Sequence, residues 1–172
     1  TFFEDPKAIM ENIVHRHEEE KMGVIIMEMV GQVHDNYYYP TFSGVAQSYN
    51  YYPISYMKRE EGIAFTALGL GRTIVEGGQA LRFSPQYPNI LPQFHSVKAT
   101  IANSQNYFYA LNLINGKNPL REGENNNLEK LELKYAEAHG VLKYVASVVC
   151  NEDKIIRDSL NEKGKRVITF AP

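Results

Sequence analysis

The residues most able to do chemistry lie in the stretch ALGLGRTIVEGG, residues 67–78, where an apolar run meets two glycines and Arg72. Strand, glycine turn and helix together hold phosphate groups in many proteins, because backbone N–H groups there face the anion. A Walker P-loop is excluded, since its lysine and hydroxyl are missing at the required spacing. A dinucleotide fingerprint is excluded because Ile74 stands where the third glycine belongs. Taken alone, Gly69 and Gly71 predict a tight turn between a strand and a helix.

The histidines and the cysteine do not form a recognisable metal site. His15 and His17 are two residues apart on a predicted helix, so they point to different faces. The remaining histidines are far apart in the sequence: His34, His95 and His139. The single cysteine, Cys150, excludes an internal disulfide and a zinc site built from cysteines. The sequence therefore predicts no metal ligands, and no serine has the context of a catalytic nucleophile.

The composition is typical of an ordered domain, and it shows no basic segment for nucleic acid and no apolar run long enough to span a membrane. The chain has 172 residues, of which 44% are hydrophobic, with 8 Phe and 12 Tyr to build a core. Its net charge of −2 with mixed signs leaves no basic segment for nucleic acid. No apolar run approaches the roughly 20 residues needed to span a bilayer. We expect a single domain or lobe over residues 1–172 in the cytoplasm.

The first part of the chain predicts a helix followed by a buried strand. Asp5 and Pro6 form a helix start, with an N-cap acceptor before a proline at the first helical position. Residues 23–30, GVIIMEMV, are short and dense in apolar and β-branched side chains, which is typical of a buried strand. Residues 31–40 are polar and aromatic and predict a loop.

The middle of the chain predicts strands with short links. Residues 43–60 indicate two strands joined by a turn at residues 50–53. Residues 62–70 predict another strand that leads into the glycines. A short helical turn over residues 73–76 and a returning strand over residues 79–84 follow. Three prolines then break the regular pattern.

The last part predicts another strand at residues 103–113 and a helix that begins at Leu128 and is interrupted at residues 139–140. Residues 141–149 are apolar, and their periodicity fits either a continued helix or a strand. The run RVITF at residues 166–170 predicts a final strand. Many strands with a few helices favour the α+β class, with a mostly antiparallel sheet flanked by helices.

Three strings occur in a set order: MEMV at residues 27–30, SGVAQS at residues 43–48 and GLGRTIVEG at residues 69–77. Together they resemble the ATP-grasp nucleotide-binding domain of the phosphoenolpyruvate synthase and pyruvate phosphate dikinase family. That family typically carries V-Q-x-M-V, then S-G-V-x-F-T, then G-L-G-E-x-V-V-x-G. The resemblance covers about residues 23–85 and implies one lobe of an ATP-grasp fold.

The resemblance implies that ATP and Mg²⁺ bind to the full-length parent, with pyruvate or phosphoenolpyruvate at another of its domains. The strand at residues 27–30 is expected to read the edge of adenine with its backbone, and its methionines offer a polarizable surface to the purine. The alternative for this stretch is a plain core strand. The residues expected to bind ATP are Met27, Glu28, Met29, Val30, Gly69, Gly71 and Arg72.

The sequence departs from the family pattern at positions that matter for catalysis. Arg72 stands where the family carries a glutamate, Gln47 replaces an aromatic residue, and no metal-binding Glu and Gln pair is found. The resemblance implies that the lysine and arginine that bind phosphate in that family belong to another lobe. We therefore expect a fragment of a phosphotransferase, with no catalytic residue of its own, whose partners are ATP and the remaining lobes and domains of the parent chain. The alternatives are a degenerate, non-catalytic homologue with a regulatory or assembly role, and an unrelated α+β binding domain.

Overall fold

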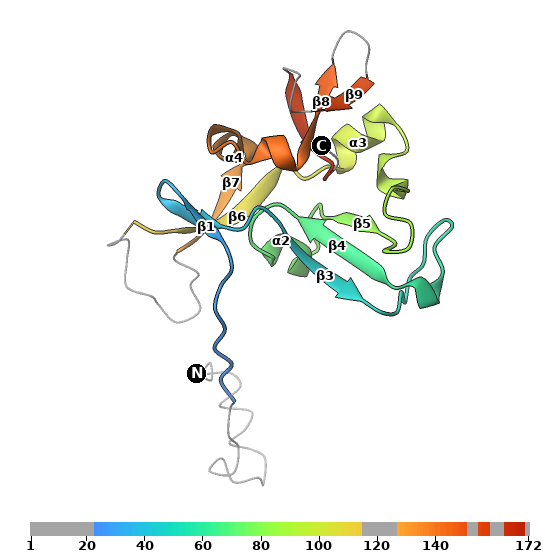
Figure 1. Ribbon diagram of the computed structural model, residues 1–172, viewed down its shortest axis with the longest axis horizontal. Helices are drawn as coiled ribbons and strands as arrows, with labels where there is room; N and C mark the ends of the chain where they lie inside the picture. Colours follow the sequence, from blue (N-terminus) through green and yellow to red (C-terminus); the bar gives the residue numbers. More distant parts are fainter. Residues whose placement is uncertain (1–22, 115–126, 151–154, 159–163, 171–172) are drawn as a thin grey trace, which may run out of the picture.

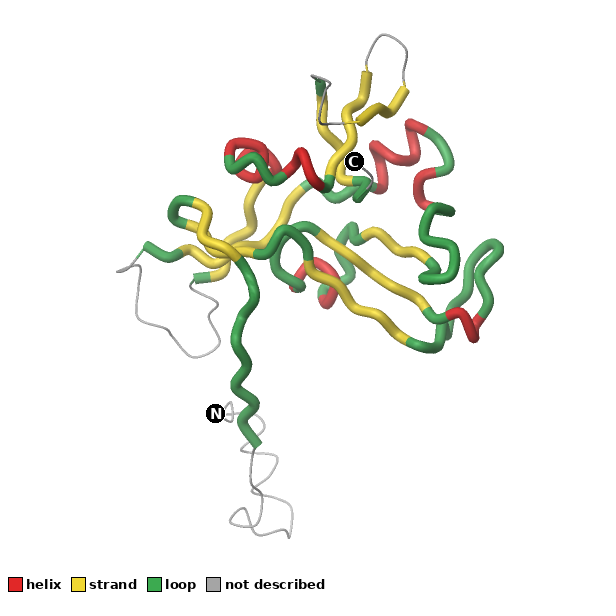
Figure 2. The backbone as a smooth tube through the Cα atoms, viewed as in Figure 1, coloured by secondary structure: helices red, strands yellow, loops and turns green. Residues whose placement is uncertain are grey.

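The computed structural model describes residues 23–114, 127–150, 155–158 and 164–170 (Figure 1). In this part of the chain, short helices accompany three sheets in which every strand pairing is antiparallel. Figure 2 separates the strands from the helices and the loops. The α+β class predicted from the sequence is confirmed. The helix predicted to begin at Asp5 lies outside the described residues.

The described elements are short. The strands are β1 (Gln32–His34), β2 (Tyr37–Tyr39), β3 (Ser43–Gln47), β4 (Ile63–Ala67), β5 (Leu81–Phe83), β6 (Tyr107–Asn112), β7 (Leu128–Glu132), β8 (Ala146–Cys150), β9 (Ile155–Asp158) and β10 (Lys165–Ile168). The α-helices are α2 (Arg72–Val75), α3 (Val97–Asn103) and α4 (Leu133–Ala138). The 3₁₀ helices are η2 (Arg59–Glu61), η3 (Pro92–Phe94) and η4 (Leu142–Tyr144). The sheets have the strand orders β1-β2-β6-β7, β3-β4-β5 and β10-β8-β9.

The four-stranded sheet, which we call the large sheet, has one buried and one outward face. Along β6 the burial alternates, so that Phe108 and Ala110 are buried while Tyr107 and Tyr109 are only partly covered. Successive side chains of a strand point to opposite faces, and this alternation follows directly. Helix α4 and η4 cover the inner face (Figure 1). The core there contains Tyr39, Leu68, Phe108, Ala110, Leu131, Ala136, Val141, Leu142, Val145, Ala146 and Ile168.

The three-stranded sheet β3-β4-β5, which we call the small sheet, is joined to the large sheet by a buried amide. The N–H of Leu68 donates to Oε1 of Gln105 at 2.8 Å, and Nε2 of Gln105 donates back to the Leu68 carbonyl at 3.0 Å. Gln105 is 3% exposed, so both bonds lie away from water. Because a buried amide is costly unless its polar atoms are paired, this contact holds the end of β4 beside β6.

Several predicted elements are confirmed and others are wrong. The strands predicted within residues 62–70, 79–84 and 103–113 are β4, β5 and β6, and the helical turn is α2. Residues 31–40 were predicted as a loop, but they form the hairpin of β1 and β2. Its turn passes through Asp35 at φ 52°, in the left-handed region that Asp tolerates better than most residues.

Two further predictions, one before β4 and one at β7, are wrong. Residues 54–60 were predicted as a strand, but they form turns that lead into η2. Helix was predicted from Leu128, yet Leu128–Glu132 is β7, which pairs with β6 in a register that sets Leu131 opposite Phe108. The tertiary partner outweighs the local helical pattern there. Residues 141–149, whose periodicity fits either a helix or a strand, contain η4 and most of β8, and the final strand is β10.

Candidate functional site

The glycine turn after β4 is packed against the backbone of β6. Gly69 has a φ of 80°, and a Cβ placed on it would lie 2.7 Å from the Tyr109 carbonyl oxygen and 2.9 Å from the Phe108 ring. Only glycine fits this conformation and this close approach. The N–H of Leu70 donates to the same carbonyl at 2.9 Å. Gly71 has ordinary helical backbone angles before α2, so the turn requires Gly69 more than Gly71.

Arg72 is held in a cluster with Glu76 and Tyr109. Its Nε donates to Oε1 of Glu76 at 2.5 Å, and its guanidinium lies 5.2 Å from the centre of the Tyr109 ring. The Tyr109 hydroxyl donates to Oε2 of Glu76 at 3.0 Å. The hydrogen bond from Arg72, followed by that from Tyr109, lowers the pKa of the Glu76 carboxyl. The Glu76 carboxylate therefore stays ionised beside Arg72. Arg72 itself is positive where the family motif carries a negative glutamate, so Glu76 supplies a negative charge next to that position.

The outward face of the large sheet carries tyrosines and a second cation. Tyr109 of β6 is opposite Lys130 of β7, so both side chains lie on this face. Tyr107 shares the face because it is two residues along the strand. The Lys130 ammonium lies 3.6 Å from the centre of the Tyr107 ring. The pairing of Tyr38 with Leu111 extends the same face onto β2.

The predicted buried strand at residues 23–30 is wrong. The segment is extended and has no strand assignment, with Ile26 90% exposed and Met27 82% exposed. Figure 1 shows it leaving the body of the molecule. Its apolar composition indicates a partner surface, but no strand of the described residues pairs with it. One polar contact anchors its end: the Tyr38 hydroxyl donates to the Met29 carbonyl at 2.7 Å.

The fold brings part of the predicted site together. Met29 reaches the outward face of the large sheet through Tyr38, and Arg72 reaches it through Tyr109. Met27 and Val30 remain in the exposed segment, as does Glu28. The sequence prediction did not include Glu76, Tyr109 or Lys130. The alternation in NYFYALNL could have indicated a tyrosine face, whereas Lys130 depends on strand pairing that no local pattern reveals.

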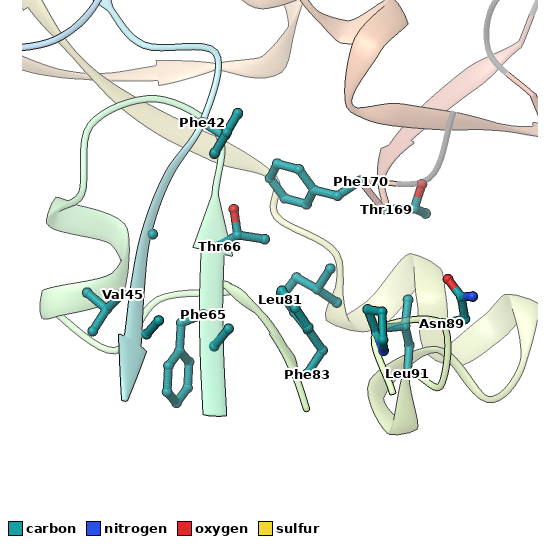
Figure 3. Close-up of a pocket in the computed structure, with 14 residues that line it drawn as sticks. Phe42, Val45, Phe65, Thr66, Leu81, Phe83, Asn89, Leu91, Thr169 and Phe170 are labelled. Atoms are coloured by element: carbon teal, nitrogen blue, oxygen red, sulfur yellow. The ribbon is translucent and has the colours of Figure 1, made fainter. Parts of the chain in front are cut away.

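A separate cavity of about 600 Å³ lies on the small sheet (Figure 3). Its lining residues are Phe42, Gly44, Val45, Ala46, Ala64, Phe65, Thr66, Leu81, Phe83, Pro88, Asn89, Leu91, Thr169 and Phe170. None of these side chains is charged. The Phe170 ring points into the cavity, and its backbone has a φ of 53°. This volume and lining suit an apolar or aromatic ring, but they offer nothing to neutralise a phosphate.

A histidine cluster lies between the β1–β2 hairpin and the end of α4. Nδ1 of His139 is 2.7 Å from the Tyr39 hydroxyl, and its Nε2 is 3.3 Å from the Asp35 carboxylate. The His34 ring stacks on His139 with centroids 5.4 Å apart. Burial, then the neighbouring His139, lowers the pKa of His34. Because Tyr39 is fully buried, this cluster stabilises the fold and does not offer a hydroxyl to a substrate.

The described residues contain no group of three or more His, Cys, Asp or Glu side chains placed to hold a metal ion. They therefore do not fit a Mg²⁺ site, and no step through Mg²⁺ can be assigned to them. A separate finding concerns membranes: in the described part of the chain, no helix is both long and apolar enough to cross one.

A model of the family described as pyruvate phosphate dikinase, AMP/ATP-binding domain, matches residues 1–155. The match covers most of the chain, so this protein belongs to that family, and the resemblance found in the three sequence strings is confirmed. It is an ATP-binding N-terminal domain of the pyruvate phosphate dikinase and phosphoenolpyruvate synthase type. Comparisons with curated protein sequences and with solved structures give no significant match.

Proposed function

We propose that this chain is the adenine-side ATP-binding lobe of a phosphoenolpyruvate synthase-like phosphotransferase. In that role it holds ATP while phosphate passes to a histidine of another domain and then to pyruvate at a third. One observation carries the proposal: the exposed segment at residues 23–30 ends beside the outward face of the large sheet. Arg72 lies on the same face.

The exposed segment has the chemistry to bind a purine. Its extended backbone presents N–H and C=O groups that no strand of the described residues uses, and such groups can read the edge of a base. Met27 and Met29 are 82% and 48% exposed. Their polarizable side chains could cover the flat face of the ring, which would remove apolar surface from water.

The isolated chain is proposed to be inactive. Phosphoryl transfer depends on positioning and on neutralising the phosphate charge, usually with metal ions and several cations. Two cations, Arg72 and Lys130, contact the tyrosine face, and the described residues offer no ligand set for Mg²⁺. Mg²⁺ and the pyruvate site are therefore assigned to the full-length parent, which we place in the cytoplasm.

Proline substitutions test whether backbone N–H groups of the exposed segment donate hydrogen bonds to adenine. Val30→Pro removes one N–H from the exposed segment, while Val24→Pro removes another at its far end; the two side chains are 81% and 80% exposed. Calorimetry on the full-length polypeptide should show ATP binding weakened about tenfold by Val30→Pro, the value of one hydrogen bond. Val24→Pro should bind ATP as the wild type does. Equal affinities in all three proteins would contradict the proposal.

The second candidate is a degenerate homologue that binds nucleotide or assembles with partners without catalysis. Arg72 in place of the family's glutamate and Gln47 in place of its aromatic residue favour it. Turnover separates the two candidates. A phosphotransferase should form phosphohistidine from ATP in the full-length protein, followed by phosphoenolpyruvate when pyruvate is added. Nucleotide binding without either product would support the degenerate homologue.

A further inference from the structure

We propose that Lys130 is a phosphate-binding residue of this domain and that it acts together with Arg72 across the tyrosine face. The ligand is the polyphosphate of a nucleoside triphosphate. This inference rests on the proposed function and adds a residue that neither the sequence pattern nor the family description assigns.

The strand register places the two cations on one surface. Lys130 is directly opposite Tyr109, and the Arg72 guanidinium lies over that same ring. The Tyr107 and Tyr109 rings are 5.8 Å apart in an edge-to-face arrangement, with the Lys130 ammonium over Tyr107. Each tyrosine therefore carries one cation, and the two cations approach the same side of the sheet.

Lys130 is available to an anion in a way that a neighbouring lysine is not. Its side chain is exposed and rests on the face of Tyr107, and within the described residues no carboxylate lies at ion-pair distance from it. Lys134, in contrast, lies 3.0 Å from the Glu132 carboxylate. A lysine that rests on a ring, with no carboxylate at ion-pair distance, retains its three N–H donors for phosphate oxygens.

Arg72 can contribute from the other side of Tyr109. Its Nε is occupied by Glu76, which leaves the terminal N–H groups of the guanidinium for a phosphate. The cluster thus contains two cations, Arg72 and Lys130, and one carboxylate, Glu76, which contacts Arg72, and the remaining positive charge suits an anion. Glu132 also lies on this face, opposite Tyr107, but its charge is balanced by Lys134.

The direction of the bound nucleotide follows from the same face. Tyr38, which binds the Met29 carbonyl, is opposite Leu111, and Tyr107 is four residues from Leu111 along β6, about 13 Å at the usual rise of a strand. Adenine at the exposed segment and phosphates at Lys130 would occupy the two ends of this path, with Arg72 between them. The cavity on the small sheet is an unsuitable phosphate site because no charged side chain lines it.

The test compares lysine variants of the full-length polypeptide by calorimetry, with ATP and adenosine as probes. Lys130→Gln removes the charge, Lys130→Arg retains it, and Lys98→Gln is the matched control because Lys98 is an exposed lysine of α3, outside the large sheet. We expect Lys130→Gln to weaken ATP binding about tenfold, the loss of one hydrogen bond to a charged group. Adenosine should bind equally to all the variants, and the other two variants should bind ATP as the wild type does.

Two outcomes overturn the role of Lys130 while leaving the proposed function in place. In one, Lys130→Gln binds ATP as tightly as the wild type. In the other, adenosine loses as much affinity as ATP. If the wild-type polypeptide binds neither ATP nor adenosine, the proposed function itself fails, and the role of Lys130 fails with it.

Discussion

The large and small sheets are both antiparallel, yet they present opposite chemistry to a ligand. The outward face of the large sheet carries Tyr107, Tyr109 and Lys130, with Arg72 added from α2. The face of the small sheet carries a cavity lined by phenylalanines and aliphatic residues, without a charge. The backbone architecture does not decide which sheet can meet a phosphate. The alternating side chains decide it.

The two sheets also differ in how much of the core they contain. Phe108 of the large sheet is fully buried, whereas Phe65 of the small sheet is only partly buried at the cavity. The large sheet is therefore the structural base of the domain, and the small sheet is the side with room for a ligand or a packing partner.

The largest expected effect separates the two sheets by stability. Phe108→Ala should lower the free energy of unfolding by about 4 kcal/mol, because a fully buried ring leaves a cavity. Phe65→Ala should lower it by about 1 kcal/mol, since that ring is only partly buried and lines the cavity. Urea unfolding of the two variants measures both changes. Similar losses would show that the small sheet is buried as deeply as the large one.

The glycine turn between the sheets gives the next effect. Gly69→Ala should cost about 3 kcal/mol, because a positive φ is combined with a contact of 2.7 Å to the Tyr109 carbonyl. Gly77→Ala is the control, with a φ of 71° and nothing within 4 Å of the added Cβ. It should cost about 1 kcal/mol from the backbone strain alone. Thermal or urea unfolding that ranks Gly77→Ala as the more damaging change would contradict this packing.

Nucleotide affinity tests the charge difference directly. Arg72→Gln in the full-length polypeptide should weaken ATP binding about tenfold, because one charge-assisted contact to phosphate is lost. Val45→Gln, which changes the wall of the cavity on the small sheet, should leave ATP affinity unchanged. Calorimetry distinguishes the variants. A greater loss for Val45→Gln would place the nucleotide on the small sheet.

The smallest expected effect concerns pH and the hairpin of the large sheet. Because the pKa of His34 is lowered in the folded protein, the unfolded chain binds more protons, and stability should fall as pH drops below about 6.5. His139, Tyr39 and the Asp35 carboxylate face the same cluster. His34→Phe retains a stacking ring but cannot titrate, so its unfolding free energy should depend less on pH. Parallel pH profiles for the two proteins would remove His34 as the cause.

The sequence predicted β4 and α2 well because the signals for these elements come from residues close together in the chain. The apolar run before Gly69 predicted β4, and the residues after it predicted α2, since glycine conformation and short-range spacing depend on neighbours in the chain. The helix predicted from Leu128 was wrong because pairing of β7 with β6 outweighed the helical pattern. The prediction for residues 23–30 was wrong for a related reason. Their composition indicates a buried strand, but a buried strand requires pairing partners, and no strand of the described residues pairs with them.

The sequence by itself determined the family, the α+β class and the position of the glycine turn, because ordered motifs and glycine chemistry can be read residue by residue. Only the tertiary structure decided that Arg72 is paired with Glu76 and that Lys130 joins it on the tyrosine face. Contacts of this kind depend on strand register, since a shift of one residue would move every side chain to the other face. The sequence gives the charge of Arg72, but the residues around that charge, Tyr109 and Lys130, come from distant parts of the chain.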